Sequence, residues 1–313
     1  MSNKVILVVL DGLNYQVARD CMGYLNGLLE LSDLQTKQGD IHEKLGDLHE
    51  KQGDLHEKQG DSYSKQSTSQ STQKNKLRAT LYPVQCELPS MSRPLYECIL
   101  TGVRPVESGI VNNQIVRLSN HESIFSLAKS QGKVTAAAAY HWVSELYNRA
   151  PFDAVRDRFT NDETMNIQHG CFYHWDHYPD EALFLDAEHL RVTHQPDFLL
   201  IHPMNIDDIG HKHGLDSRQY RNSARGADIY LSNYLEKWVD DGYQVIITSD
   251  HGMNNDLSHG GILPEEREVP FFVIGDKFTH QECSVKQTDI CGSVCQLLNL
   301  EHDKSYTQEL LAL

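Results

Sequence analysis

Six aspartate and histidine residues lie where buried segments of the chain are expected to end. Asp11 follows the apolar run 5–10, and Asp250 with His251 follows the apolar run 245–248. Carboxylate oxygens and imidazole nitrogens together are typical ligands of zinc and other divalent transition metals. Six such ligands are about enough for two metals, and a metal pair about 3.5–4 Å apart can stabilise both the attacking and leaving oxygens of a phosphoryl transfer. The candidate set is Asp11, Asp207, His211, Asp250, His251 and His259, with His213 as an alternative to His211 by spacing alone.

A candidate nucleophile stands in the segment 89–94 (PSMSRP), where an extended stretch is expected to turn into a helix. Ser92 lies at that turn, and Pro94 suits the first turn of the helix. A helix N-terminus presents free N–H groups and favours an anion, so a metal-bound serine alkoxide there could attack phosphorus. Ser90 or Ser92 could instead simply cap the helix, and the spacing leaves both interpretations open.

Most of the chain alternates between expected strands and helices. Such alternation predicts an α/β fold with an open, mostly parallel central sheet and helices on both faces. Ligands of such sheets bind beyond the carboxyl ends of the strands, which is where the candidate residues fall. The expected strands are 4–10, 79–86, 133–140, 197–203, 243–248 and 269–274, and the expected helices are 15–31, 93–102, 123–130, 181–194, 217–240 and 287–298.

One segment interrupts this pattern. From Lys37 the chain repeats every seven residues, with KQGDIHE, KLGDLHE and KQGDLHE in succession. Each repeat has one reliable apolar position and a glycine, whereas a coiled-coil seam needs two apolar positions per heptad. We therefore predict a single domain over 1–313 that contains a flexible or weakly helical insertion over 34–78, with an extended helix or intermolecular coil as the alternative. His42, His49 and His56 recur because the heptad is duplicated, which explains their spacing without a ligand role.

Composition excludes several classes of protein. The chain has 313 residues and a formal net charge of −16, which disfavours binding to nucleic-acid polymers and anionic membranes. No apolar run approaches about 18 residues, so no membrane span is expected. The run 5–10 is short and lacks a small-residue cleavage site, which favours a buried strand over a signal peptide. The seven scattered cysteines suit reduced thiols, so we expect a cytoplasmic protein.

Taken in order, these motifs resemble the alkaline phosphatase superfamily, and within it the type I phosphodiesterase/nucleotide pyrophosphatase branch. No single motif is specific, but the ordered set is, and it covers nearly the whole chain outside the heptads. The matching segments are 8–12 (VVLDG), 88–94 (LPSMSRP), 100–102 (LTG), 109–113 (GIVNN), 207–214 (DDIGHKHG), 249–253 (SDHGM), 259–261 (HGG) and 287–290 (QTDI).

The resemblance implies an alkaline phosphatase-like fold and two divalent metal ions, with zinc expected first and manganese as the alternative. It implies one metal held by Asp11, Asp250, His251 and the Ser92 oxygen, and another held by Asp207, His211 and His259. It makes Ser92 the nucleophile, nine residues before Thr101, where many relatives have threonine. Asn113 matches an asparagine that contacts phosphoryl oxygen, and Arg93 is a further candidate for substrate binding. Ser108 stands where relatives commonly have histidine.

The mechanism implied has two steps, in which Ser92 forms a phospho-serine and a metal-bound hydroxide then hydrolyses it. The expected function is hydrolysis of a small phosphodiester or nucleotide. A phosphomonoesterase or a phosphonate hydrolase on the same two-metal core is the alternative. An alternative of another class is a scaffold that self-associates through its heptad repeats.

Overall fold

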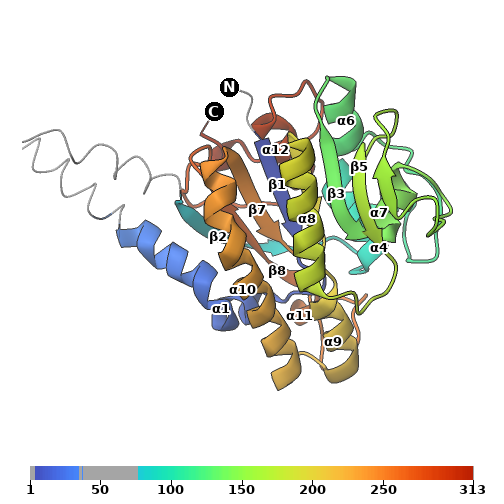
Figure 1. Ribbon diagram of the computed structural model, residues 1–313. Coiled ribbons are helices and arrows are strands. Elements are labelled where there is room, and N and C mark those ends of the chain that lie inside the picture. The colour runs from blue at the N-terminus through green and yellow to red at the C-terminus, as the bar shows by residue number, and fades with distance from the viewer. Residues whose placement is uncertain (1–3, 35–36, 38–76, 313) are drawn as a thin grey trace, which may run out of the picture.

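The computed structural model describes residues 4–34, 37 and 77–312 (Figure 1). The predicted insertion at 34–78 lies almost entirely outside these residues, together with His42, His49 and His56. Its conformation, and the role of its heptads in association, therefore stay predictions.

The described strands form one eight-stranded sheet in the order β2-β8-β7-β1-β6-β3-β5-β4. The five neighbours β7, β1, β6, β3 and β5 pair in parallel, whereas β8 is antiparallel to both β7 and β2, and β4 is antiparallel to β5. The predicted mostly parallel sheet is thus confirmed. The strands are β1 Lys4–Val9, β2 Ala79–Gln85, β3 Thr135–Tyr140, β4 Phe159–Asn161, β5 His169–Tyr173, β6 Phe198–Ile201, β7 Tyr243–Thr248 and β8 Glu268–Ile274.

Helices cover both faces of this sheet. Successive side chains of β1 alternate between two cores, with Val5, Leu7 and Val9 in one and Ile6, Val8 and Leu10 in the other. α4, α6, α7 and α12 contribute to the first core, and α1, α8 and α10 contribute to the second (Figure 1). Both faces of β1 are therefore dry, which is why its sequence is an unbroken apolar run. Among the described residues the helices include α1 Tyr15–Cys21, α4 Ser92–Thr101, α5 Pro105–Ser108, α6 Ile124–Ser130, α7 His141–Tyr147, α8 Asp180–His194, α9 Asn205–His213, α10 Arg218–Asp240, α11 Pro264–Arg267 and α12 Asp289–Leu297.

The predicted helix over 15–31 is broken after Cys21. Met22 leaves the helical conformation, and helical residues resume at 23–34. The cause is a tertiary contact, because the Asp228 carboxylate of α10 accepts hydrogen bonds from the backbone N–H groups of Tyr24 at 2.7 Å and Leu25 at 3.1 Å. A carboxylate at this position caps the new helix start as a local N-cap residue would.

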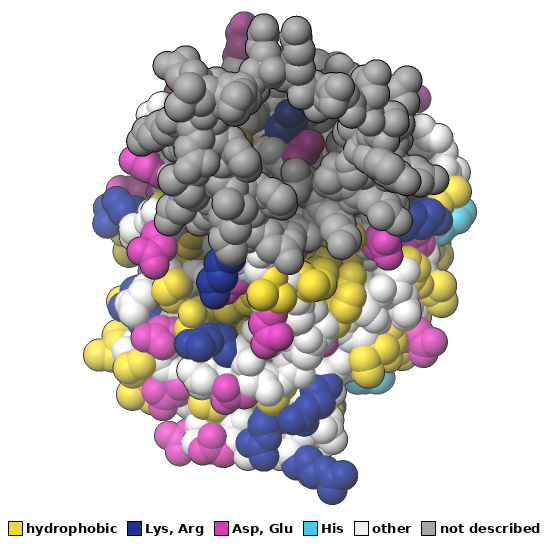
Figure 2. Space-filling model, turned by 90° about the vertical axis from the view of Figure 1, so that its left-hand side faces the viewer, with side chains coloured by type: hydrophobic (Ala, Val, Ile, Leu, Met, Phe, Trp, Pro, Cys, Tyr) yellow, Lys and Arg dark blue, Asp and Glu magenta, His cyan; other side chains and the backbone are white. Residues whose placement is uncertain are grey.

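The acidic excess of the sequence is not gathered on the face shown in Figure 2. Acidic, basic and apolar side chains are interspersed there among the described residues. Within residues 4–34, 37 and 77–312, we found no helix with the length and hydrophobicity to cross a bilayer.

Candidate metal centre and nucleophile

The candidate ligands lie at the carboxyl ends of three neighbouring strands. Asp11 follows β1 by two residues and Asp250 follows β7 by two residues, so their parallel pairing brings the two carboxylates together. Asp207 lies on α9, which begins shortly after β6 on the other side of β1. Gly12 permits the close approach of α9, because a Cβ at this position would lie 2.9 Å from the Asp207 Cα.

The first cluster consists of Asp11, Asp250 and His251. One donor atom from each residue lies within 4.8 Å of the others, and all three residues are buried. His251 Nε2 is 3.5 Å from Asp11 Oδ1 and 3.2 Å from Asp250 Oδ2. Two carboxylates and one imidazole so arranged form a nitrogen-and-oxygen site suited to a divalent metal.

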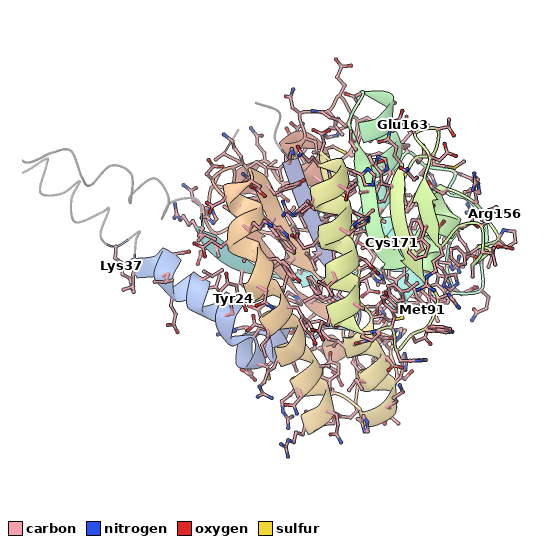
Figure 3. All side chains as sticks on the ribbon, viewed as in Figure 1. Tyr24, Lys37, Met91, Arg156, Glu163 and Cys171 are labelled. Carbon is pink, nitrogen blue, oxygen red and sulfur yellow. The ribbon has the colours of Figure 1, made fainter. Side chains whose placement is uncertain are left out.

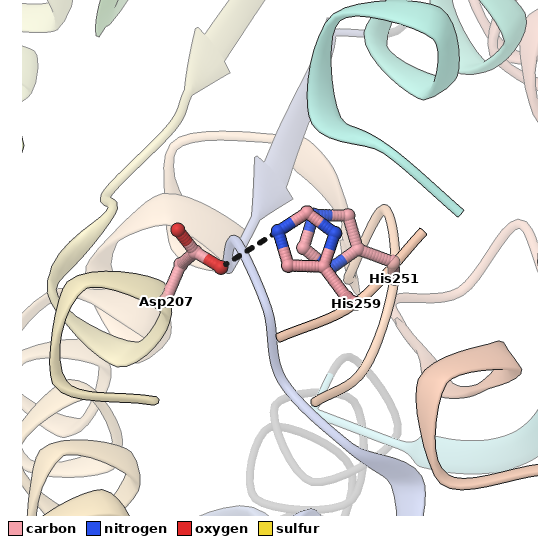
Figure 4. Close-up of side chains that lie close together, drawn as sticks. All are labelled: Asp207, His251 and His259. Carbon is pink, nitrogen blue, oxygen red and sulfur yellow. Dashed lines mark ion pairs between the residues drawn. The ribbon is translucent and has the colours of Figure 1, made fainter. Parts of the chain in front are cut away.

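The second cluster consists of Asp207, His211 and His259. His211 Nε2 lies 3.4 Å from Asp207 Oδ2. His259 Nε2 lies 3.6 Å from Asp207 Oδ1, as the dashed line in Figure 4 marks. The two imidazole Nε2 atoms are 3.2 Å apart. His211 lies four residues after Asp207 on the same helix and His213 lies six residues after it, so the helical period favours His211.

The two clusters adjoin each other. The rings of His251 and His259 stack with their centroids 3.6 Å apart (Figure 4). Asp207, His251 and His259 also have donor atoms within 4.8 Å of one another. The six predicted ligands thus lie in one region, in two adjoining groups.

The hydrogen bonds of the three histidines determine which ring nitrogen carries the proton. In each ring Nδ1 faces a backbone carbonyl: Gly252 O at 2.8 Å for His251, Ser90 O at 2.7 Å for His259 and Leu257 O at 2.8 Å for His211. A carbonyl only accepts hydrogen bonds, so each Nδ1 is the donor and each Nε2 keeps its lone pair. The Nε2 atoms are the ones that face the carboxylates, as metal-ligating histidines require.

The buried carboxylate oxygens also fit a cation. Asp11 Oδ1, Asp250 Oδ2 and Asp207 Oδ1 are buried and have no hydrogen-bond donor. Leaving a buried charged oxygen unpaired is costly, and a divalent ion in each cluster would compensate these atoms. The donor set and these unpaired atoms therefore match the expected pair of metals.

Burial and the charges of neighbouring groups shift the pKa values of the three aspartates when no metal is bound. Burial, and then the charge of Asp11, raise the pKa of Asp250 to about 6. Burial, followed by the charges of Asp11 and Asp250, raises the pKa of Asp207 well above its usual value. Burial tends to raise the pKa of Asp11 as well, but the hydrogen bond from His202 and the electrostatic interaction with His251 outweigh it, so this pKa is lowered. Burial lowers the pKa of His259 to about 3, which keeps that ring neutral.

Ser92 is the first residue of α4, and its hydroxyl does not cap that helix. The N-cap is Met91, which makes no side-chain capping bond and is labelled at the lower right of the molecule in Figure 3. The Ser92 Oγ instead lies 3.0 Å from His251 Nε2, beside the first cluster. The capping alternative is therefore wrong for Ser92.

Ser90 joins two loops of the site. Its hydroxyl donates to Gly261 O at 2.8 Å and accepts from Gly260 N at 3.1 Å, while its carbonyl accepts from His259 Nδ1. These bonds fasten the His259 loop to the segment before α4. Ser90 is buried and fully engaged, so Ser92 is the better-placed nucleophile.

Asn113 and Arg93 lie beside the start of α4. The Asn113 Oδ1 accepts a hydrogen bond from the Arg93 backbone N–H at 3.1 Å, which leaves the asparagine near Ser92. The Arg93 side chain points into the interior, is 1% exposed and pairs with Glu145 at 2.7 Å. Its guanidinium also lies over the Trp142 ring at 4.6 Å. A substrate contact by Arg93 stays a prediction, and this placement does not favour it.

Comparison with known families shows to which family the chain belongs. Residues 5–259 match the family model described as type I phosphodiesterase/nucleotide pyrophosphatase. The chain belongs to this family. The family and its fold are those of phosphodiesterase- and pyrophosphatase-type enzymes.

Curated relatives include both transferases and pyrophosphatases. The chain is 30% identical over 219 residues to mouse GPI ethanolamine phosphate transferase 1, covering 64% of this chain and 23% of that protein. It is 24% identical over 258 residues to ectonucleotide pyrophosphatase/phosphodiesterase 2 of Saccharomyces cerevisiae, covering 71% of this chain and 51% of that protein. The chain therefore spans about a quarter of the first relative and about half of the second.

Solved structures share the fold. Murine ectonucleotide pyrophosphatase/phosphodiesterase 5, in complex with AMP as an inactive threonine-to-alanine variant, matches with a TM-score of 0.60 and 14% identity over 99% of this chain and 100% of that one. The human protein matches with a TM-score of 0.61. At this identity the likeness shows the fold alone, and it confirms the predicted family fold.

Several residues around the clusters were missed by the sequence analysis. Glu266 of α11 accepts hydrogen bonds from Asn254 Nδ2 at 2.6 Å and Gly261 N at 2.7 Å, so it holds both sides of the loop that carries His259. Tyr96 and His202 both donate to Asp11. Because His202 directly follows β6, its sequence position indicates that it lies at the carboxyl end of the sheet. Nothing in the spacing of the residues indicates that it bonds to Asp11.

Proposed function

We propose that the chain is a metal-dependent phosphoric ester hydrolase of the phosphodiesterase/nucleotide pyrophosphatase type that acts through a phospho-serine. The observation that carries this proposal is the arrangement of three unpaired, buried carboxylate oxygens that face the Nε2 atoms of His251 and His259, beside a serine hydroxyl that no helix cap uses. The substrate class that we assign is a small phosphodiester or nucleotide.

In this proposal Asp11, Asp250, His251 and Ser92 hold one divalent ion, and Asp207, His211 and His259 hold the other, with zinc as the first expectation. When bound, such ions would lower the pKa of the Ser92 hydroxyl and neutralise negative charge on the phosphoryl oxygens. The murine neighbour is inactive when one threonine becomes alanine, which supports a hydroxyl nucleophile in that protein and, by analogy, Ser92 here.

The residues of the chain divide the reaction between them. Ser92 Oγ forms a bond to phosphorus, the bond from phosphorus to the leaving oxygen breaks, and that oxygen takes up a proton. Water then attacks the phospho-serine, releasing the phosphate product and restoring the serine. We assign the Ser92 backbone N–H, at the start of α4, and the Asn113 side-chain NH₂ as hydrogen-bond donors to the phosphoryl oxygens. The next two residues of the helix offer no donor, because the Arg93 N–H already donates to Asn113 Oδ1 and Pro94 has no N–H.

The test is hydrolysis of bis-p-nitrophenyl phosphate, p-nitrophenyl phosphate and a phosphonate monoester by the zinc-loaded chain. The proposal predicts fastest turnover of the diester. Preference for the monoester or the phosphonate would assign the chain to the alternative activities on the same core. Absence of turnover for all three, with two metals bound, would contradict a general phosphoric ester hydrolase.

A second candidate is transfer of the phosphoryl group to an alcohol. The ethanolamine phosphate transferases among the relatives favour it, because the same phospho-serine can react with an alcohol in place of water. Product analysis with added ethanolamine or glycerol distinguishes the two: a hydrolase releases free phosphate ester at an unchanged rate, whereas a transferase forms the new ester.

A further inference from the structure

We infer that Tyr96 and His202 are positioning residues that hold the Asp11 carboxylate for metal binding and tie it to the helix that carries the nucleophile. The inference rests on the metal centre of the proposed function, and neither residue belongs to the ligand sets assigned above. It concerns hydrogen bonds to the Asp11 side chain, because such bonds fix the orientation of a side chain that ligates a metal.

One oxygen of Asp11 receives both hydrogen bonds. The Tyr96 hydroxyl donates to Asp11 Oδ2, and His202 Nε2 lies 3.1 Å from the same atom. Tyr96 is 2% exposed and His202 is 1% exposed, so water does not compete for these contacts. The other oxygen, Oδ1, has no hydrogen-bond partner and faces His251 Nε2 at 3.5 Å.

The tautomer of His202 separates it from the three ligand histidines. The backbone N–H of Tyr140 points to its Nδ1 at 3.4 Å, which makes Nδ1 the acceptor and places the proton on Nε2. In His211, His251 and His259 the proton lies on Nδ1 and Nε2 is free. His202 is therefore a hydrogen-bond donor to the ligand carboxylate, although it lies among the ligands.

The pair also connects three elements of the fold. Tyr96 is four residues after Ser92 on α4, so the two side chains share one face of the helix. His202 follows β6, and the Tyr173 hydroxyl of β5 donates to its carbonyl at 2.7 Å. The rings of Tyr96 and His202 contact each other edge to face, with centroids 4.5 Å apart. Fixing Asp11 Oδ2 thus fixes the position of α4, and with it Ser92, relative to the first cluster.

Zinc affinity of the full-length protein tests this inference directly. Metal-free Tyr96→Phe and His202→Ala variants would be titrated with zinc against a chromogenic chelator, with melting temperature as a measure of folding. We expect one of the two zinc sites to weaken by about 10- to 100-fold in each variant while the other keeps its wild-type affinity. A parallel His211→Ala variant, which should weaken the other site, assigns the two.

Two further variants control for packing. Tyr147→Phe removes a buried tyrosine hydroxyl that donates to Glu97 at 2.8 Å, and it should leave both zinc affinities unchanged. His202→Gln keeps a donor group and should recover part of the zinc affinity lost in His202→Ala. The comparison of these two variants still tests the inference if Tyr96→Phe does not fold.

Wild-type zinc affinity in folded Tyr96→Phe and His202→Ala proteins would overturn the inference, as would equal weakening of both sites. A wild-type chain that binds no zinc would overturn the metal centre itself, and the inference with it.

Discussion

At the scale of the residue, the chemistry depends on which atoms are left without partners. Asp11 Oδ1, Asp207 Oδ1 and Asp250 Oδ2 lie buried with no donor, while the neighbouring histidines use Nδ1 for backbone carbonyls. The unpaired atoms converge, and a bound cation is the simplest way to compensate them. The nucleophile assignment follows the same logic, because the Ser92 hydroxyl faces His251 and takes no part in capping α4.

Replacing Ser92 with alanine should remove nearly all hydrolysis, by about 10³-fold or more, because the group that forms the bond to phosphorus is lost. Zinc content should stay near two, since Ser92 supplies only one ligand of four to one site. Turnover of bis-p-nitrophenyl phosphate and elemental analysis measure both. The matched control is Ser90→Ala, which should retain a measurable rate and weaken the His259 site through the loss of its two loop contacts. A dead Ser90→Ala beside an active Ser92→Ala would show that the nucleophile was misassigned.

Metal binding should release protons. In the metal-free protein the pKa of Asp250 is about 6 and that of Asp207 is raised, so these carboxyls hold protons at a pH where free aspartate has lost them. The metal binds the deprotonated form, so its affinity should rise with pH and fall steeply below about pH 6. Since the pKa of His259 is about 3, this ring should not set the acid limit. Calorimetric zinc titration near pH 6 in buffers of different ionisation enthalpy counts the protons, and an absence of proton release there would contradict the raised carboxyl pKa values.

At the scale of the element, the ends of neighbouring strands bring the ligands together. The carboxyl ends of β1, β7 and β6 lead into Asp11, Asp250 and α9, and Gly12 lets α9 approach. This part of the site could be predicted from sequence, because each ligand follows an apolar run and parallel strands end at the same edge.

Gly12→Ala should lower the stability of the fold and weaken the second metal site. Gly12 has a φ of +73°, and an added Cβ would lie 2.9 Å from both Cα and Cβ of Asp207. Gly132→Ala is the matched control, because Gly132 has a φ of +76° but open space around it. Both variants should lose roughly 1–2 kcal/mol through backbone strain, and only Gly12→Ala should also lose zinc affinity. Equal zinc binding by the two would show that α9 does not depend on this contact.

Other parts of the structure could not be predicted, for identifiable physical reasons. β5 (His169–Tyr173) carries histidine, glycine and cysteine, so it lacks the apolar run that marked β1. The break after Cys21 arises from the Asp228 carboxylate, more than 200 residues away along the chain. The bonds from Tyr96 and His202 to Asp11 join residues 85 and 191 positions away, so no local pattern could indicate them.

At the scale of the whole molecule, the candidate centre is built from the core of strands and helices, while the heptad segment contributes none of the assigned ligands. All of Asp11, Ser92, Asp207, His211, Asp250, His251 and His259 lie outside residues 34–78. Insertion length has a small effect on loop-closure entropy, so the domain should tolerate its shortening.

Deleting residues 37–71 should therefore leave turnover of a small soluble phosphodiester within a few-fold of the parent chain, with two metals still bound. Steady-state kinetics and solution mass of the two proteins measure activity and association together. A drop in mass with unchanged turnover would assign the heptads to self-association. A large loss of turnover in a folded, fully metallated deletion variant would contradict the bystander role and favour a lid or an assembly role in catalysis.

The most direct test of the central claim is turnover of bis-p-nitrophenyl phosphate measured as a function of zinc bound per chain. Protein stripped with a chelator and dialysed would be titrated with zinc, with rate and bound metal recorded at each point. We predict negligible turnover without metal, full turnover as bound zinc approaches two per chain, and no further rise beyond that. Turnover that survives complete removal of metal, or that reaches its maximum at one zinc per chain, would contradict a two-metal centre.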